Sequence, residues 1–380
     1  MRRVFAFPTF LLLGLTASIA LIAGPAVGAT ARPDALTDTH VAPAGFTAPH
    51  RVVGGAFDGV AEVVDSANHV HLAATGKGGV WYMTDRSGGW TAHRILTNPH
   101  SGAYTNPLIA IDEHDRVYIA ATKWVGPEVP TYLGSFYVTD KGRARGTFPS
   151  TPTRIAPAGK GAESLKVANG HIYAALDYAE CCVSPDWPPV WFRTNASGSW
   201  VTTKLGNGQS PSMRLPTNGH ARIVYSGQSG LQYAVAATAS GSFSKVRIPS
   251  TTGKDSWPLL SLDTSGSSAV AWFHDNGSAG WTERYSTRKS GSWSAPLTVA
   301  SSLNGFDAVS FDMDTLGRAN VVIANSDDQM LRDMRLVGSS WTSLPIAGPV
   351  AVNAVSVRRA AAGVVVVAWA TNTGIWVSMG

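Results

Sequence analysis

A repeat with a period near 50 residues organises this sequence of 380 residues. Each copy of the repeat contains one strand that opens with an aromatic residue. Three further segments with the composition of short strands lie between one such strand and the next, separated by turns rich in Gly, Asp and Ser. The copies are separated by 44, 58, 52, 43, 50 and 48 residues, counted between the aromatic residues that open one strand of each: Phe46, Trp90, Phe148, Trp200, Phe243, Trp293 and Trp341. Such a period, made only of strands, is typical of a β-propeller blade. We therefore predict an all-β fold, a seven-bladed β-propeller of four-stranded blades.

The two ends of the repeat region complement each other. The last copy begins at Val352 and supplies three strands before the chain ends at Gly380, whereas "FTAPHRVV" at Phe46 is a fourth strand with nothing before it. An N-terminal strand that completes the last blade would remove a free sheet edge. We expect residues 45–380 to form the propeller, preceded by a short segment of residues 32–44.

The first residues have the pattern of a secretory signal peptide. A basic head of Arg2 and Arg3 precedes an apolar run from Val4 to Ala23, and small residues follow. We expect residues 1–31 to be the signal peptide and the mature protein to be secreted and extracellular. The alternative is that the segment is retained as an N-terminal anchor.

Charge and hydropathy exclude several classes of partner. The chain has 30 basic and 25 acidic residues, so removal of Arg2 and Arg3 leaves 28 against 25, with no basic run. This balance does not favour nucleic-acid binding. No later segment approaches the roughly 20 apolar residues that span a bilayer, so we expect no membrane association after signal cleavage.

Two neighbouring repeats carry insertions between their second and third strands. The segments are "KWVGPEVPTYLG" from Lys123 and "DYAECCVSPDWPPV" from Asp177, and the topology places both on the same face of a propeller. Flat aromatic rings beside carboxylates suit a sugar. The candidate ligand-binding residues are Trp124, Tyr132, Asp177, Tyr178, Glu180 and Trp187, with Glu128 and Asp186 as further acceptors.

These residues favour binding of an extracellular glycan or a similar polar ligand, and three other interpretations stay open. The aromatic residues can instead pack the loops onto the ring. Paired acids, or His274 and Asp275 on the same face, can serve a polysaccharide lyase or a glycoside hydrolase. The surface can also be a docking scaffold for another protein.

The only two cysteines, Cys181 and Cys182, are adjacent and lie within the second insertion. In an oxidising compartment they are expected to pair, either with each other or between chains. We favour the bond between neighbours, which closes a strained eight-membered ring because consecutive Cα atoms are only about 3.8 Å apart.

We expect no metal ion and no cofactor. His69 and His71 lie on one face of a strand, but a third ligand is missing from the motif. Asp312 and Asp314 resemble the opening of a calcium loop, yet they fall where the repeat places an ordinary turn.

The turns "TDRSGGW", "TNASGSW" and "TRKSGSW" before three of the fourth strands resemble the Asp-box turns of sialidase-like propellers in secreted bacterial proteins. Asp85 stands five residues before the aromatic residue, as in that family, whereas Ser87 replaces the family's glycine. The resemblance extends from Phe46 to Gly380 and implies the β-propeller architecture of that family. The family's arginine triad, tyrosine nucleophile and acid have no matching motif here, so no catalytic residue is carried over.

Overall fold

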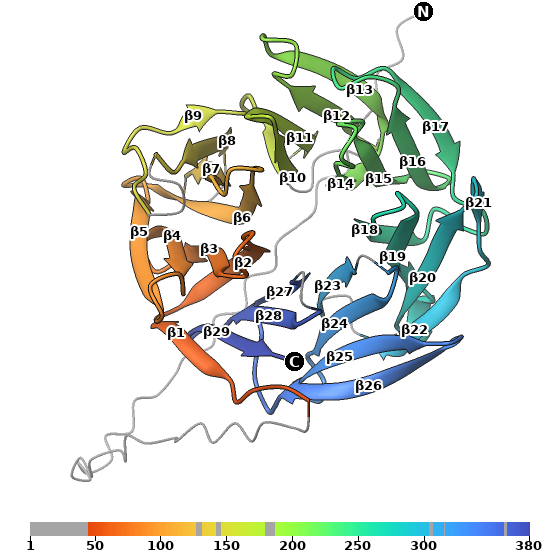
Figure 1. Cartoon of the computed structure of the whole chain (residues 1–380). Helices are drawn as coiled ribbons and strands as arrows, with labels where there is room; N and C mark the ends of the chain where they lie inside the picture. The colour runs from red at the N-terminus through yellow and green to blue at the C-terminus, as the bar shows by residue number, and fades with distance from the viewer. Residues whose placement is uncertain are drawn as a thin grey trace, which may run out of the picture. The chain divides into compact units, whose positions relative to one another are not determined.

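The computed structural model describes residues 45–126, 131–141, 146–178, 187–303, 307–314, 316–360 and 363–380. Within these residues the strands form seven antiparallel sheets arranged as blades around a channel (Figure 1). The predicted seven-bladed propeller is therefore confirmed. The predicted signal peptide, Glu128, Glu180, both cysteines and Asp186 lie outside the described residues.

Each blade runs outward from the channel in chain order. Blade one contains β2 (Phe57–Val64), β3 (Val70–Gly76), β4 (Gly79–Thr84) and β5 (Thr91–Thr97). Blade two contains β6 (Gly102–Ile111), β7 (Val117–Val125), β8 (Thr131–Thr139) and β9 (Thr153–Arg154). Blade three contains β10 (Lys160–Ala168), β11 (His171–Tyr178), β12 (Pro189–Thr194) and β13 (Val201–Asn207).

The remaining blades follow the same order. Blade four contains β14 (Gln209–Arg214), β15 (Arg222–Gly227), β16 (Gly230–Ala236) and β17 (Phe243–Arg247). Blade five contains β18 (Asp255–Leu262), β19 (Ser268–Asp275), β20 (Trp281–Lys289), β21 (Ser292–Trp293) and β22 (Leu297–Leu303). Blade six contains β23 (Ala308–Met313), β24 (Ala319–Asn325), β25 (Met330–Val337) and β26 (Ser340–Ala347), and blade seven contains β27 (Ala354–Arg359), β28 (Val365–Ala370) and β29 (Gly374–Met379).

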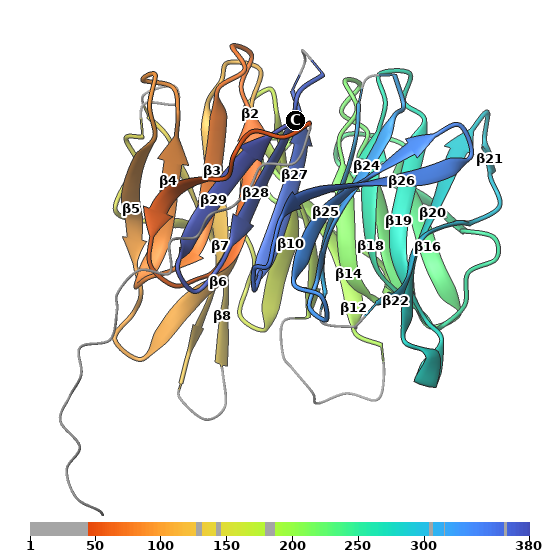
Figure 2. The same cartoon turned by 90° about the horizontal axis from the view of Figure 1, so that it is seen from below.

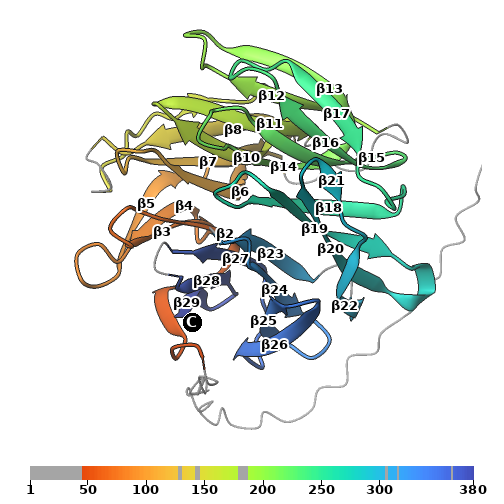
Figure 3. The same cartoon turned by 45° about the vertical axis from the view of Figure 1, so that its right-hand side comes forward.

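Two fourth strands are shorter or more broken than the repeat predicts. In blade two only β9 remains of the segment at Phe148, and in blade five β21 and β22 pair with β20 one after the other (Figure 3). Both segments contain proline, which has no N–H to donate to a ladder. Pro149 and Pro152 precede β9, and Pro296 separates β21 from β22.

The repeated aromatic residue joins neighbouring blades. Phe148 of blade two packs edge-to-face on Tyr82 of blade one, with ring centroids 5.1 Å apart. Phe243 packs in the same way on Phe192 at 5.0 Å, Trp293 on Tyr233 at 5.2 Å and Trp341 on Tyr285 at 5.2 Å. In every pair the fourth-strand ring meets the third strand of the preceding blade. The repeat thus records a contact between blades.

The core lies between the sheets. Second strands such as β24 and β28 are buried along almost their whole length, because each blade packs between two others. Small side chains on these strands, including Ala73, Ala74, Ala174 and Ala175, allow the sheets to approach closely near the channel. The described residues contain no helix long and apolar enough to cross a membrane.

The ring has two distinct faces, seen from the side in Figure 2. We call the face that carries the second-to-third strand loops face A; the paired ends of β7 and β8 reach beyond the ring there. The opposite face, face B, carries the first-to-second strand turns. In four of these turns a carboxylate accepts the backbone N–H of the residue four positions later. The four residues are Asp65, Asp112, Asp263 and Asp314. Asp314 therefore occupies an ordinary turn, as the sequence predicts.

The Asp-box-like turns also lie on face B. The carboxylate of Asp85 accepts the N–H of Val70 at 2.8 Å, and the amide oxygen of Asn195 accepts the N–H of Ile172 at 2.7 Å. Gly88 and Gly198 have φ values of 81° and 85°, which a glycine adopts without a steric penalty. The shared motif thus fixes the start of the second strand.

The N-terminal strand β1 (His50–Gly54) pairs antiparallel with β29. Upstream of it, the N–H of Thr47 donates to the Met379 carbonyl at 2.7 Å, and the Ser378 hydroxyl donates to the Thr47 carbonyl at 2.7 Å. Phe46 is buried, and the guanidinium carbon of Arg335 in blade six lies 5.5 Å from its ring centroid. These contacts place Phe46 as the other repeat aromatics are placed, against the preceding blade.

We predict that this N-terminal strand closes the ring. Deletion of the chain up to Val53 should lower the free energy of unfolding by several kcal/mol, because ladder bonds and apolar contacts of β29 are lost. Thermal and urea unfolding would measure the change. A truncation of residues 1–44, which keeps Phe46 and β1, is the control. Equal stability of the two truncated proteins would contradict closure by this strand.

Candidate functional site

The first strands of five consecutive blades carry a bulge where they reach face A. The register against the second strand shifts between Phe57 and Gly59 in blade one and between Ala162 and Ser164 in blade three. It shifts at the corresponding position in blades two, four and five. In these three blades a proline, Pro107, Pro211 or Pro258, stands within the shift and removes a ladder donor.

The residue displaced by each bulge is polar or aromatic. The five bulge residues, in blade order, are Asp58, Asn106, Glu163, Ser210 and Trp257. Three of them, Asn106, Ser210 and Trp257, have φ values of 51°, 52° and 46°. Positive φ is strained for these side chains and is found preferentially at functional sites. We call these five residues the bulge ring.

The best-connected part of the bulge ring is a carboxyl pair in blade three. Glu163 from β10 and Asp177 from the paired strand β11 are hydrogen-bonded to each other. The side-chain amide of Asn106 donates to Glu163 Oε2 at 3.1 Å, and the N–H of Ser210 donates to Asp177 Oδ2 at 2.9 Å. Blades two and four thus hold the pair from both sides.

Burial governs the ionisation of this pair. Removal from water raises the pKa of Glu163, and the neighbouring charge of Asp177 raises it further. Burial also raises the pKa of Asp177, although the bonds from Ser210 and Glu163 counteract it. The two effects place a shared proton on Glu163, which then donates to the ionised Asp177. The pair therefore presents both a proton donor and an acceptor at the channel mouth.

Blade five contributes a histidine and an aromatic surface to the same face. His274 Nδ1 lies 2.9 Å from Oδ1 of Asp255, which is fully buried and also accepts the indole N–H of Trp272 at 2.7 Å. Trp257 is 45% exposed and its ring packs on Trp281 at 5.5 Å between centroids. The buried carboxylate orients the imidazole, and the tryptophan offers a flat surface beside it.

The sequence named His274 and Asp275 as residues that can supply a base on this face, and the structure places them in different contacts. Asp275 accepts the N–H of Gly277 at 2.7 Å in its own turn, whereas Asp255 contacts the imidazole. The difference arises because β18 and β19 are antiparallel and place Asp255 opposite His274.

The described candidate residues of the two insertions all lie at the face A ends of strands in blades two and three. Trp124 and Tyr132 are paired across β7 and β8 and are half-buried. Tyr178 is 39% exposed at the end of β11, and Trp187 is half-buried just before β12. Asp177 is buried. The structure thus joins Asp177 to Glu163 and Asn106, which the sequence did not identify.

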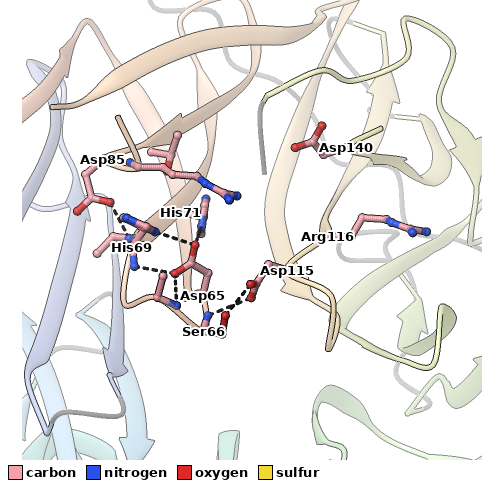
Figure 4. Close-up of polar contacts among 12 residues, drawn as sticks. Asp65, Ser66, His69, His71, Asp85, Asp115, Arg116 and Asp140 are labelled. Carbon is pink, nitrogen blue, oxygen red and sulfur yellow. Dashed lines mark hydrogen bonds and ion pairs between the residues drawn. The ribbon is translucent and has the colours of Figure 1, made fainter. Parts of the chain in front are cut away.

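His69 and His71 of blade one lie near face B, on the opposite side of the propeller from the bulge ring. Asp65 Oδ2 is 3.0 Å from His69 Nδ1 and 3.2 Å from His71 Nε2 (Figure 4). The Tyr82 hydroxyl is 2.7 Å from His71 Nδ1. Both imidazoles thus contact the carboxylate of a face B turn. In the part of the chain that the structure describes, no group of three or more His, Cys, Asp or Glu residues is arranged to hold a metal ion.

Comparison with known proteins identifies relatives of the fold. No family model matches this chain, and no curated protein matches it. A solved ulvan lyase of polysaccharide lyase family PL25 is similar, with a TM-score of 0.58 and 12% identity over 89% of this chain and 95% of that one. A protein of unknown function from Dyadobacter fermentans is also similar, with a TM-score of 0.52 and 8% identity over 89% and 98% of the two chains.

Sialidase-like propellers are found in the same comparison. The intramolecular trans-sialidase from Ruminococcus gnavus has a TM-score of 0.44 and 10% identity, over 85% of this chain and 93% of that one. The seven-bladed architecture that the resemblance implies is seen in the sheets of this chain itself. Identities this low indicate a shared fold and do not transfer a site.

The carboxyl pair predicts a pH dependence of stability. A raised pKa in the folded state adds stability that is present at low pH and is lost as pH rises through the folded pKa, here between about pH 5 and 9. Glu163→Gln keeps a hydrogen-bond donor and acceptor but cannot ionise. Between pH 5 and pH 9 its free energy of unfolding should therefore fall by roughly 1–3 kcal/mol less than that of the unsubstituted protein. Urea unfolding at pH 5 and pH 9 would measure the difference.

Glu113→Gln is the matched control for this measurement. The pKa of Glu113 is lowered by backbone hydrogen bonds, so its contribution should stay nearly constant over the same pH range. Parallel pH profiles for Glu163→Gln and the unsubstituted protein would show that no proton is held by the pair.

Proposed function

We propose that this chain is a secreted propeller that binds an extracellular glycan, or a polar ligand of similar chemistry, on face A. The observation that carries the proposal is the bulge ring, which places four hydrogen-bonding side chains and one exposed indole around the channel mouth. Sugars present hydroxyl groups at their edges and apolar C–H faces, so acids, amides and an aromatic ring recognise them together. The insertions of blades two and three extend this surface toward the rim.

The fold comparison supports the choice of ligand class. A second structure of the ulvan lyase holds the fragment -[GlcA(1-4)Rha3S]- and is equally similar to this chain, with a TM-score of 0.58. Secretion is supported by the N-terminal pattern of the sequence. A protein-docking scaffold remains the alternative if no glycan binds.

Cleavage of the bound glycan is a second candidate function. Two features favour it: the contact between the buried carboxyl groups of Glu163 and Asp177, whose pKa values burial raises, and the imidazole of His274 beside the buried Asp255. A raised carboxyl pKa suits a general acid and an oriented imidazole suits a general base, the two roles required by a lyase or a hydrolase. Reducing ends and unsaturated products, measured with the polysaccharide that binds, would separate catalysis from binding.

We predict that Trp257→Ala weakens glycan binding at least tenfold, because the stacking surface is lost, while the melting temperature changes little. Trp257→Phe should retain most of the affinity. A glycan array would first identify the ligand, and titration calorimetry would then give the dissociation constants.

Val337→Ala provides a control for this experiment because Val337 is 63% exposed and lies at the third-to-fourth strand turn of face B. Its affinity should match that of the unsubstituted protein. Failure of every glycan to bind, or unchanged binding by Trp257→Ala, would overturn the proposal.

A further inference from the structure

The channel opens on face B into a hollow of about 710 Å³ that is separate from the bulge ring. Its walls are the last residues of the first strands β14, β18, β23 and β27, together with the turns that follow them. The bulge ring lies at the opposite ends of these strands, since each first strand begins at face A and ends at face B. The hollow therefore belongs to no part of the site described above.

Four arginines from three blades line this hollow. Arg214 and Arg222 belong to blade four, Arg318 to blade six and Arg359 to blade seven. Among the described residues that line the hollow, two are carboxylates, Asp263 and Asp314, so the described lining has a net charge of +2. Arg318 is the most accessible of the four, with its side chain 59% exposed.

Carboxylates are shared between arginines at this end of the channel. Asp314 Oδ2 lies 2.5 Å from Arg318 Nε and 2.7 Å from Arg359 Nη1. Two residues earlier along the chain, on β23, Asp312 Oδ1 lies 3.5 Å from Arg214 Nη2 and 3.3 Å from Arg358 Nη1. Each aspartate thus balances two guanidinium groups, and positive charge is left in excess.

The titration of the deeper groups reflects this excess. Burial lowers the pKa of Lys166, and the positive charges of Arg214 and Arg358 lower it further. The pKa of Arg214 is also lowered, to about 10, by burial and by the charge of Arg358. Burial raises the pKa of Glu62, although the charge of Arg358 acts against this shift. A bound anion would relieve the repulsion among these cations.

We propose that this hollow is a second binding site, which takes a small organic anion through a carboxylate, sulfate or phosphate group. Guanidinium groups recognise these oxyanions through paired hydrogen bonds. In the described residues the side chain of Arg318 bonds Asp314 through Nε and is 59% exposed, which leaves its two Nη groups for a ligand. The volume is in the range of small-molecule pockets and exceeds the needs of one inorganic ion.

The test is titration calorimetry at constant ionic strength with D-glucuronate, inorganic sulfate and inorganic phosphate, and with D-glucose as the neutral comparison. We expect at least one anion to bind the unsubstituted protein and D-glucose not to compete for that site. Arg318→Gln and Arg222→Gln should each weaken anion binding at least tenfold. Comparison of the three anions shows which oxyanion the site prefers.

Arg332→Gln is the matched control. Arg332 is also paired with an aspartate four residues away in blade six, Asp328 at 2.5 Å, but it lies at the face A end of the blade. This variant should bind the anion within twofold of the unsubstituted protein. Absence of binding by all three anions, or full binding by Arg318→Gln, would overturn the second site without bearing on glycan binding at face A.

Discussion

The aromatic contact between consecutive blades is the interaction on which this ring depends. In four described pairs, a fourth-strand Phe or Trp stands edge-on against an aromatic ring of the preceding blade, with centroids 5.0 to 5.2 Å apart. Each such pair contributes about 0.5–1.5 kcal/mol beyond the area it buries. Because these contacts join neighbouring blades, no sheet needs to be stable alone.

These aromatic contacts involve the outer strands of the blades, so the first strands around the channel are available for function. Around the channel, five first strands depart from regular pairing and turn Asp58, Asn106, Glu163, Ser210 and Trp257 toward face A. At the face B end of the channel, arginines of blades four, six and seven line a hollow. The two ends of the channel thus differ in chemistry: face A combines acids, amides and an indole, whereas face B is cationic.

The sequence predicted the fold well because the aromatic residues that join neighbouring blades repeat once in each blade. Phe148, Phe243, Trp293 and Trp341 are visible as a period before any contact is known, and Asp85 signals its turn by spacing alone. The shortened β9 was less visible, since a proline-rich segment can retain its aromatic residue and lose its ladder. The half-buried Trp187 and the exposed Tyr178 lie on face A, where the topology of the repeat predicts them.

The site was only partly predictable because its contacts cross between strands and blades. Glu163 precedes the strand-like run of its blade and meets Asp177 only through the β10–β11 register. Asp255 reaches His274 in the same way, although Asp275 is nearer in sequence. A usable signal was present in Pro107, Pro211 and Pro258, each directly after a bulge residue. The arginine hollow carried no comparable signal, since its arginines come from three blades that are far apart in the sequence.

Backbone amide exchange with and without a bound glycan tests the central claim most directly, because it reports which strand ends a ligand covers. We expect added protection in peptides that contain the bulge ring, at residues 57–60, 104–108, 160–165, 208–212 and 255–260. Protection confined to the face B turns at residues 215–219, 263–267 and 316–318, with the bulge ring unchanged, would contradict a glycan site on face A.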